Sequence, residues 1–271
     1  MINADFHIHS SFSDDSDEKM EDMILEGIRQ KLQYMCFTEH MDYDFPVNPK
    51  DPEYTFIVDT PAYQDECLRL AAQYSSKINV RFGIELGLQE HLAEKHLSYV
   101  NQFPFDFVIG SVHICNRKDP YYSEFYEGRT EREAYTEYFE SVLSNIQAYN
   151  DYDILGHMDY VVRYGPNRNA NYSYAAYSDI IDEILRTVID KGHGLEMNVS
   201  GFAAGLGHPN PCEDVIKRYR ELGGKIITVG SDSHDVGHLR NDRVMSTHVL
   251  EACGFKYYTI FKNRQPEFIA L

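Results

Sequence analysis

Seven short apolar runs, rich in β-branched and aromatic residues, recur along the whole chain and alternate with longer amphipathic segments. The amphipathic segments have a helical period and cover residues 18–31, 61–77, 131–149, 175–191 and 212–223. Because parallel strands are joined by helical crossovers, this order predicts a parallel sheet covered by helices. The strand-like runs are Ala4–Ile8, Tyr34–Thr38, Val80–Leu86, Phe107–Val112, Asp153–Gly156, Gly194–Asn198 and Lys225–Gly230.

Each run ends on, or is followed at once by, a residue that can bind a metal or hydrogen-bond a ligand. In an α/β barrel all the strand carboxyl ends open on one face, whereas an open sheet spreads them along a line. We therefore expect an α/β TIM-like (β/α)7 barrel with a metal site at the carboxyl ends of its strands. The residues at these ends are His7, His9, His40, Glu85, His113, His157, Asn198, Asp232 and His234.

The chain has 271 residues, and barrels of this kind commonly occupy about 250 residues as one domain. No low-complexity segment, repeat or long linker divides it, so we expect a single domain over residues 1–271. Residues 44–60 contain Pro46, Pro49 and Pro52 and are predicted to form a long surface loop. The pair Gly223-Gly224 is expected to end the helix before the last strand.

The net charge of −18 argues against nucleic acid as a substrate, because proteins that grip its backbone cluster lysine and arginine. A small anionic substrate stays compatible with this charge if bound divalent cations offset the acidity locally. Five cysteines without a CxxC pair indicate free thiols in a reducing compartment. No apolar run approaches the ~18 residues of a membrane span, and residues 1–5 lack signal-peptide features. We therefore expect a cytoplasmic protein with no membrane partner.

The strand ends carry the residue types that metals require. His7 and His9 stand at i and i+2, so they point to the same side of a strand, and imidazole binds zinc, iron or manganese. Asp5 shares that side and is placed to orient one of the rings. Glu85 interrupts an apolar strand, which is costly unless the charge is paired or metal-bound, so we expect it to bridge two cations. Each motif alone is compatible with a structural histidine, but the joint placement favours a metal cluster.

Eight or nine ligands exceed what one ion takes, since zinc usually binds about four and iron or manganese up to about six. The set therefore predicts two or three ions of zinc, iron or manganese. Multinuclear sites lower the pKa of a bridging water and clamp phosphate oxygens, so hydrolysis of a small phosphate ester is the leading reaction. Amide hydrolysis on a binuclear site is the alternative, although no lysine ends a predicted strand. A protein that only stores metal would not need its ligands at a barrel mouth.

Six motifs follow one another in a fixed order: Asp5-x-His7-x-His9, Thr38-Glu39-His40, Gly83-x-Glu85, Gly110-Ser111-x-His113, Gly156-His157-x-Asp159 and Gly230-Ser231-Asp232-x-His234. In this order they resemble the signature of the polymerase-and-histidinol-phosphatase (PHP) family. The resemblance extends from Asp5 to about Phe261 and implies a distorted (β/α)7 barrel with a trinuclear metal centre.

The resemblance also implies a distribution of the ligands over three metals. The first would be held by His7, His9, Glu85 and Asp232, the second by Glu85, His113 and His157, and the third by His40, His234 and an early carboxylate. In Ser13-Asp14-Asp15-Ser16 the direct match to that carboxylate is Asp14, with Asp15 as a close rival because the family's glycine is missing.

The chain's size and its carboxyl-terminal pattern resemble the stand-alone L-histidinol-phosphate phosphatases of this family. The segments concerned are Leu195–Gly201, Gly254-Phe255 and Phe261–Pro266. The resemblance implies a phosphomonoesterase of histidine biosynthesis, in which a metal-bridging hydroxide attacks phosphorus and Asp232 or His234 protonates the leaving group.

Phosphate binding also calls for a cation outside the metal ligands, since arginine presents paired donors to phosphate oxygens. Arg163 is the first candidate and Arg117 the second. The family often has an arginine where this chain reads Phe202-Ala203-Ala204, so either Arg240 or Arg243 substitutes for it or the substrate is another small phosphate ester.

Overall fold

Seven parallel strands, arranged in chain order, form the centre of the computed structural model, which describes residues 1–47, 52–239 and 243–271. A further short strand, β3 (His40–Met41), follows β2 and pairs with β4. The seven strands are β1 (Ala4–Ile8), β2 (Tyr34–Phe37), β4 (Asn79–Gly87), β5 (Phe107–Ser111), β6 (Ile154–Leu155), β7 (Gly194–Asn198) and β8 (Ile227–Gly230).

The sheet nearly closes on itself between its first and last strands. Just beyond β8, Asp232 N donates to His7 O across 2.8 Å, and His9 N donates to Ser233 O across 2.9 Å. Ile8 also forms an isolated parallel bridge with Ser233. These contacts join the carboxyl ends of β1 and β8, so the expectation of a distorted seven-stranded TIM-like barrel is confirmed.

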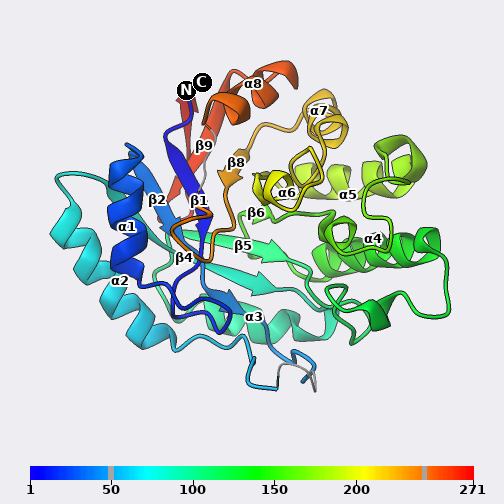
Figure 1. Ribbon diagram of the computed structural model, residues 1–271, viewed down its shortest axis with the longest axis horizontal. Helices are drawn as coiled ribbons and strands as arrows, with labels where there is room; N and C mark the ends of the chain where they lie inside the picture. The colour runs from blue at the N-terminus through cyan, green and yellow to red at the C-terminus, as the bar shows by residue number, and fades with distance from the viewer. Residues whose placement is uncertain (48–51, 240–242) are drawn as a thin grey trace.

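Helices surround this sheet, with α1 (Met20–Arg29) and α2 (Thr60–Tyr74) on one side and α4 (Glu131–Ala148) and α5 (Ser178–Asp190) on the other (Figure 1). The first helix buries Met20, Met23 and Ile24, the apolar stripe that its sequence period predicts. The other helices are α3 (Ala93–Val100), α6 (Ser200–Ala203), α7 (Glu213–Glu221) and α8 (Arg243–Ala252). Within the described ranges, no helix is long and apolar enough to cross a membrane.

Turn residues explain where several of these elements begin and end. Thr130 and Glu133 form a reciprocal capping box at the start of α4. Gly223 adopts φ 102° directly after α7, which is the predicted stop before β8. The short 3-10 helices are η1 (Glu90–Leu92), η2 (Ser123–Phe125), η3 (Tyr160–Arg163) and η4 (Tyr174–Tyr177).

The fold contains elements that the sequence pattern did not predict. Residues 87–104, which had no assignment, form η1 and α3, and the carboxyl-terminal segment forms the hairpin of β9 (Tyr257–Lys262) and β10 (Gln265–Ala270). Asn263 and Arg264 make the hairpin turn at positive φ, without the usual Asn-Gly signal. Residues 44–47 and 52–59 contain no helix, in keeping with the predicted loop, whereas 48–51 lie outside the described residues.

The hairpin supports the amino-terminal side of the barrel. Phe261 of β9 packs on Phe107 with ring centroids 4.9 Å apart, and Phe107 meets Phe6 at 5.4 Å. Asn3 N, just before β1, donates to the Tyr258 hydroxyl across 3.3 Å. The two chain ends therefore lie side by side, as Figure 1 shows. With this end of the barrel filled by aromatic side chains, the opposite end is left for polar residues.

Candidate metal centre

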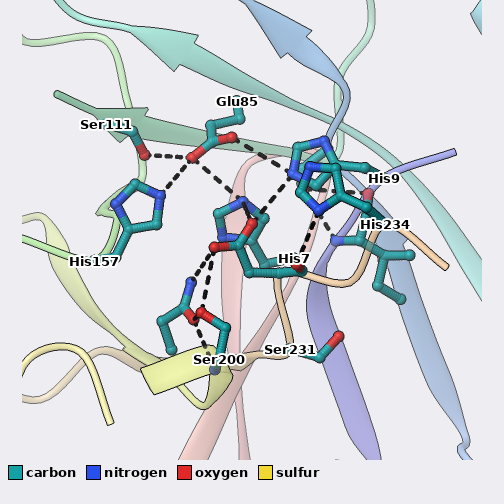
Figure 2. A network of polar contacts seen from close by, with 12 residues as sticks. His7, His9, Glu85, Ser111, His157, Ser200, Ser231 and His234 are labelled. Carbon is teal, nitrogen blue, oxygen red and sulfur yellow. Dashed lines mark hydrogen bonds and ion pairs between the residues drawn. The ribbon is translucent and has the colours of Figure 1, made fainter. Parts of the chain in front are cut away.

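The polar residues that follow the strands converge at the carboxyl end of the barrel (Figure 2). They arrive from β1, β3, β4 and from the segments just after β5, β6 and β8. Their ligand atoms form overlapping groups of three, with all atoms of a group within 4.8 Å of one another. The groups are His9, His40 and His234; His7, His157 and Asp232; His7, His9 and Glu85; His40, Asp42 and His113; and Glu85, His113 and His157.

Glu85 contacts five histidine rings of this cluster, and its two oxygens face different rings, some of which Figure 2 shows. Oε1 lies 2.9 Å from His157 Nε2, 3.2 Å from His7 Nε2 and 3.3 Å from His113 Nε2. Oε2 lies 3.1 Å from His40 Nδ1 and 3.5 Å from His9 Nε2. Ser111 donates to Oε1 across 2.6 Å and so restrains the carboxylate. This position suits a carboxylate shared between two cations.

Several ligand atoms of the cluster are buried without a hydrogen-bond partner. Among the described residues, these include His7 Nε2, His9 Nε2, His40 Nδ1, Glu85 Oε2 and His234 Nε2. Unsatisfied buried polar atoms are costly, and their concentration in one place calls for a cation that satisfies them together. The donor set of imidazoles and carboxylates matches the preferences of zinc, iron and manganese. The residues present therefore fit a multinuclear metal site.

The charge state of His9 agrees with a role as ligand. Burial lowers its pKa to about 3, and the neighbouring His234 and His40 contribute in the same direction. The His9 ring stacks on both neighbours, with centroids 4.2 Å from each. His9 is therefore a neutral imidazole in the physiological range, and neutral imidazole is the form that coordinates a metal.

The two early aspartates have different surroundings. Asp15 Oδ2 lies 3.2 Å from His234 Nε2 and 3.7 Å from His40 Nε2, beside the ligands expected for the third metal. Asp14, the direct motif match, instead accepts hydrogen bonds from Thr55 N at 2.6 Å, Thr55 Oγ1 at 2.9 Å and Phe56 N at 2.8 Å. Its carboxylate is thus committed to the loop before α2, and the geometry favours Asp15 at the cluster.

Two carboxylates that sequence reasoning missed hold the outer nitrogens of the ligand rings. Glu196 Oε1 lies 2.7 Å from His7 Nδ1, and its Oε2 accepts from His157 N across 2.8 Å. Asp42 Oδ1 lies 2.7 Å from His113 Nδ1. Such partners fix the orientation of a metal-binding ring. Glu196 interrupts an apolar strand as Glu85 does, so the same signal was present, whereas Asp42 stands in a loop that carries no local signal.

Asp5 has a different partner from the one expected. Its Oδ1 accepts from Ser231 N across 2.9 Å and from His7 N across 3.3 Å, and neither contact is to an imidazole ring. Asp5 therefore ties β1 to the segment after β8 rather than orienting a ligand. The prediction was wrong because the alternation of side chains along a strand shows which face of the sheet Asp5 lies on, but not which group its carboxylate contacts.

Arg163 reaches the cluster from η3. Its Nε donates to Asn210 Oδ1 across 2.9 Å and its Nη1 to Asp232 Oδ2 across 2.8 Å. Its Nη2 is buried and has no hydrogen-bond partner among the described residues. Arg163 lines a cavity of about 110 Å³ together with Asp232, His234 and His157. The guanidinium is thus held by two contacts and keeps one donor for an anion beside the metal ligands.

The other predicted arginines lie elsewhere. Arg117 is exposed in a turn at φ 62° and lines a separate cavity with Glu90 and His91. Arg243 Nη1 donates to Asn3 Oδ1 and Lys31 O, at the amino-terminal side of the sheet, so it does not replace a cation at this site. Arg240 lies outside the described residues. Only Arg163 of the predicted set that the structure describes meets the cavity.

The segment Phe202-Ala203-Ala204 adjoins the cluster from another direction. Phe202 and Ala203 line a second cavity, of about 500 Å³, which also borders Asp232 and His234. Arg168 lies behind this segment, where its Nη1 donates to Ala204 O across 2.8 Å. Where the resemblance leads one to expect an arginine, the described part of the chain therefore has apolar side chains beside an open volume.

Comparison with known proteins agrees with this geometry. A histidinol-phosphatase from Lactococcus lactis subsp. lactis (strain IL1403) is 36% identical over 238 residues, which cover 86% of this chain and 85% of the relative. A probable histidinol-phosphatase from Clostridium acetobutylicum is 34% identical over 255 residues, which cover 93% of this chain and 94% of the relative.

A solved structure matches over nearly the full length. The crystal structure of histidinol phosphate phosphatase from Lactococcus lactis, complexed with zinc, L-histidinol and phosphate, superposes with a TM-score of 0.89. It is 32% identical, and the superposition covers 98% of both chains. The family model of the PHP domain matches residues 5–200, which hold most of the ligand residues described above. This chain therefore belongs to the PHP domain family.

Proposed function

We propose that this protein is a metal-dependent phosphomonoesterase that hydrolyses L-histidinol phosphate to L-histidinol and phosphate. The observation that carries the proposal is that Arg163 Nη2 and a neighbouring cluster of buried ligand atoms have no hydrogen-bond partner among the described residues. A phosphate ester offers oxygens both to bound cations and to an arginine, and so satisfies both groups at once. The related histidinol-phosphatases and the zinc-, histidinol- and phosphate-bound structure support the choice of ester.

The metal ligands that we propose are His7, His9, Asp15, His40, Glu85, His113, His157, Asp232 and His234. Bound there, the cations would lower the pKa of a coordinated water and neutralise phosphate oxygens. Glu85 is placed to be shared between them, and Glu196 and Asp42 keep the rings of His7 and His113 in position. Two or three ions, of zinc, iron or manganese, are consistent with this number of ligands.

The remaining steps fall to side chains of the same cavity. Arg163 would bind the non-bridging phosphate oxygens, orient the ester so that its leaving oxygen lies opposite the attacking water, and stabilise the charge that develops on the phosphate. The leaving alkoxide of L-histidinol needs a proton, and Asp232 or His234, which both line the cavity, supplies it. The products would be inorganic phosphate and L-histidinol, the amino alcohol that this hydrolytic step contributes to histidine biosynthesis.

Another small phosphate ester is the alternative substrate, and the position of Phe202 at the second cavity favours it. With Phe202 and Ala203 at the second cavity, the described residues provide one arginine, Arg163, for the phosphate. A binuclear amidohydrolase is less well supported, because none of the described residues that line the metal-site cavity is a lysine. A panel of small phosphate esters, compared by kcat/KM, separates the first alternative from the proposed function.

Metal removal tests the proposal directly. The protein is stripped with a chelator, its metal content is measured by elemental analysis, and it is reloaded separately with zinc, iron and manganese. We expect phosphate release from L-histidinol phosphate to disappear on stripping and to return with at least one metal. Stripped protein that keeps its full activity would contradict the proposal.

The wider properties that we propose rest on the same residues. One central sheet and one hydrophobic core cluster, which includes residues of the β9–β10 hairpin, support a single domain over residues 1–271. The five cysteines are free, and Cys36, Cys67, Cys115 and Cys253 are buried, which supports a reducing compartment, the cytoplasm. The net charge of −18 supports a small phosphorylated substrate rather than nucleic acid.

A further inference from the structure

Asp119 differs from the other carboxylates that line the metal-site cavity in its lack of a cationic partner. Asp15, Asp42 and Asp232 each lie within ion-pair distance of a histidine or an arginine. Across residues 1–47, 52–239 and 243–271, no such contact involves Asp119, whose Oδ1 accepts one hydrogen bond, from Tyr121 N across 2.7 Å. Loss of solvation raises the pKa of Asp119 to about 7, although the hydrogen bond from Tyr121 N and the nearby His113 act in the opposite direction. Among the described residues, Asp119 is thus a carboxylate of this cavity that no cationic side chain pairs with.

The loop after β5 holds Asp119 in place. Cys115 and Lys118 exchange backbone hydrogen bonds of 2.9 and 3.0 Å around Asn116 and Arg117, which both have positive φ. This tight two-residue turn reverses the chain directly before Asp119. Because Oδ1 is bound to Tyr121 N, the carboxylate has a fixed orientation and its Oδ2 remains available within the described part of the chain. The loop is therefore preorganised to present one carboxylate oxygen at the cavity.

The proposed substrate carries a cation that this oxygen would match. In L-histidinol phosphate a primary ammonium stands on the carbon next to the phosphorylated carbon, so it must lie close to the phosphate. The imidazole, with an ordinary pKa of about 6.5, is largely neutral at neutral pH, whereas the primary amine stays protonated. Arg163 and Asp119 line the same cavity, with Tyr160 and Tyr164 among its other walls. The cavity thus pairs a cation for the phosphate with an anion for the ammonium.

We propose that Asp119 binds the α-ammonium group of the substrate and thereby selects phosphate esters of amino alcohols over esters without an amine. A hydrogen bond between an ammonium and a carboxylate is short and strong where water is largely excluded. This inference rests on the proposed phosphatase function and adds to it the residue that recognises the amino-alcohol leaving group. Asp119 touches no reacting atom in this role, so it acts on substrate specificity rather than on the chemical step.

The test compares Asp119→Asn with the wild type on two esters. One is L-histidinol phosphate, and the other is 3-(imidazol-4-yl)propyl phosphate, which lacks only the amine. Asparagine keeps an oxygen that can accept from Tyr121 N, so the turn is expected to survive. We expect Asp119→Asn to lower kcat/KM by about 10- to 100-fold on L-histidinol phosphate, mainly through KM, and by less than about threefold on the analogue.

A matched control removes an equal charge outside the cavity. Asp44 is exposed, pairs with His91 across 3.0 Å and does not line the metal-site cavity, so Asp44→Asn should leave both esters at the wild-type level. Activity of Asp119→Asn on the analogue also reports that the variant is folded and metal-loaded. An equal loss on both esters, or a wild type that hydrolyses both equally well, would overturn the role of Asp119. A metal-loaded wild type that hydrolyses neither ester would overturn the phosphatase function itself, and this inference with it.

Discussion

Arg163 donates from Nη1 to Asp232 Oδ2 across 2.8 Å, and the other oxygen of Asp232 faces two histidines that we propose as metal ligands. Asp232 Oδ1 lies 3.5 Å from His7 Nε2 and 3.6 Å from His9 Nε2. Asp232 also adopts φ 55°, a left-handed conformation that aspartate tolerates better than most residues. Asp232 therefore links Arg163, the proposed phosphate-binding residue, to the histidines of the cluster. A substitution of Arg163 is expected to affect both phosphate binding and the position of Asp232.

Replacement of Arg163 should therefore weaken phosphate binding and turnover together. We expect Arg163→Met to lower kcat/KM by about 10²- to 10³-fold, because a preorganised donor to the transition state is lost. Arg163→Lys should recover part of this, since lysine keeps the charge but not the fork of two donors. Steady-state kinetics and the inhibition constant of inorganic phosphate measure both effects. Arg117→Met serves as the control and should change neither value, and an Arg163→Met variant that did the same would refute the assignment.

The pair Asp14 and Asp15 allows a matched comparison of neighbours. Asp15→Asn should lower the metal content by about one ion per chain and kcat/KM by more than about 10²-fold, beyond the effect of losing an outer partner. Asp14→Asn should leave the metal content unchanged, because this carboxylate is bonded to Thr55 and Phe56. Elemental analysis of both purified variants decides the matter. The reverse result, with metal lost only from Asp14→Asn, would restore the assignment that the motif suggests.

Glu85→Gln should disrupt the cluster most severely, because a neutral amide cannot be shared between two cations and places an NH2 group against imidazole nitrogens. We expect loss of more than one ion per chain and of nearly all activity. The melting temperature of the variant should match that of chelator-treated wild type, because bound metal stabilises only the folded state. Glu90→Gln, an exposed change just after the same strand, provides the control. Normal metal content in Glu85→Gln would rule out the bridging position.

A pair far from the metals predicts a pH effect on stability. Arg218 donates to both oxygens of Asp182, at 2.9 and 2.6 Å, and these hydrogen bonds lower the pKa of Asp182 to about 2. Since the unfolded carboxyl has a pKa of about 3.9, the stabilisation is complete above that value and is lost as pH falls toward 2. Asp182→Asn should lower the melting temperature by about 1–2 °C at pH 7, as expected for a surface ion pair.

Thermal unfolding of wild type and Asp182→Asn at pH 7, 4.5 and 3 tests this. The difference between the two proteins should be equal at pH 7 and 4.5 and smaller at pH 3. A difference that grew as the pH fell would contradict the sign of the pKa shift. Because both proteins carry the same metal centre, loss of metal in acid affects both and cancels in the comparison.

Most of the barrel was predictable because its strands are buried apolar runs that alternate with amphipathic helices. β1 and β7 have the predicted bounds, and β6 is shorter than its predicted run by one residue at each end. The elements that were missed include α3, α6, α8, β3 and the β9–β10 hairpin, which are short or have an exposed face. Such elements depend on packing against the rest of the fold more than on local propensity. Their sequences alone do not distinguish them from loops.

The sequence by itself predicted the principal ligands that we propose, because a pleat of period two and the ends of parallel strands dictate where His7, His9 and Glu85 point. Only the tertiary structure placed Asp15 rather than Asp14 beside His234, placed Glu196 behind His7, and separated Arg163 from Arg117. These choices depend on how loops from different strands fold against one another. Contacts between residues so distant along the chain leave no periodic pattern in the sequence.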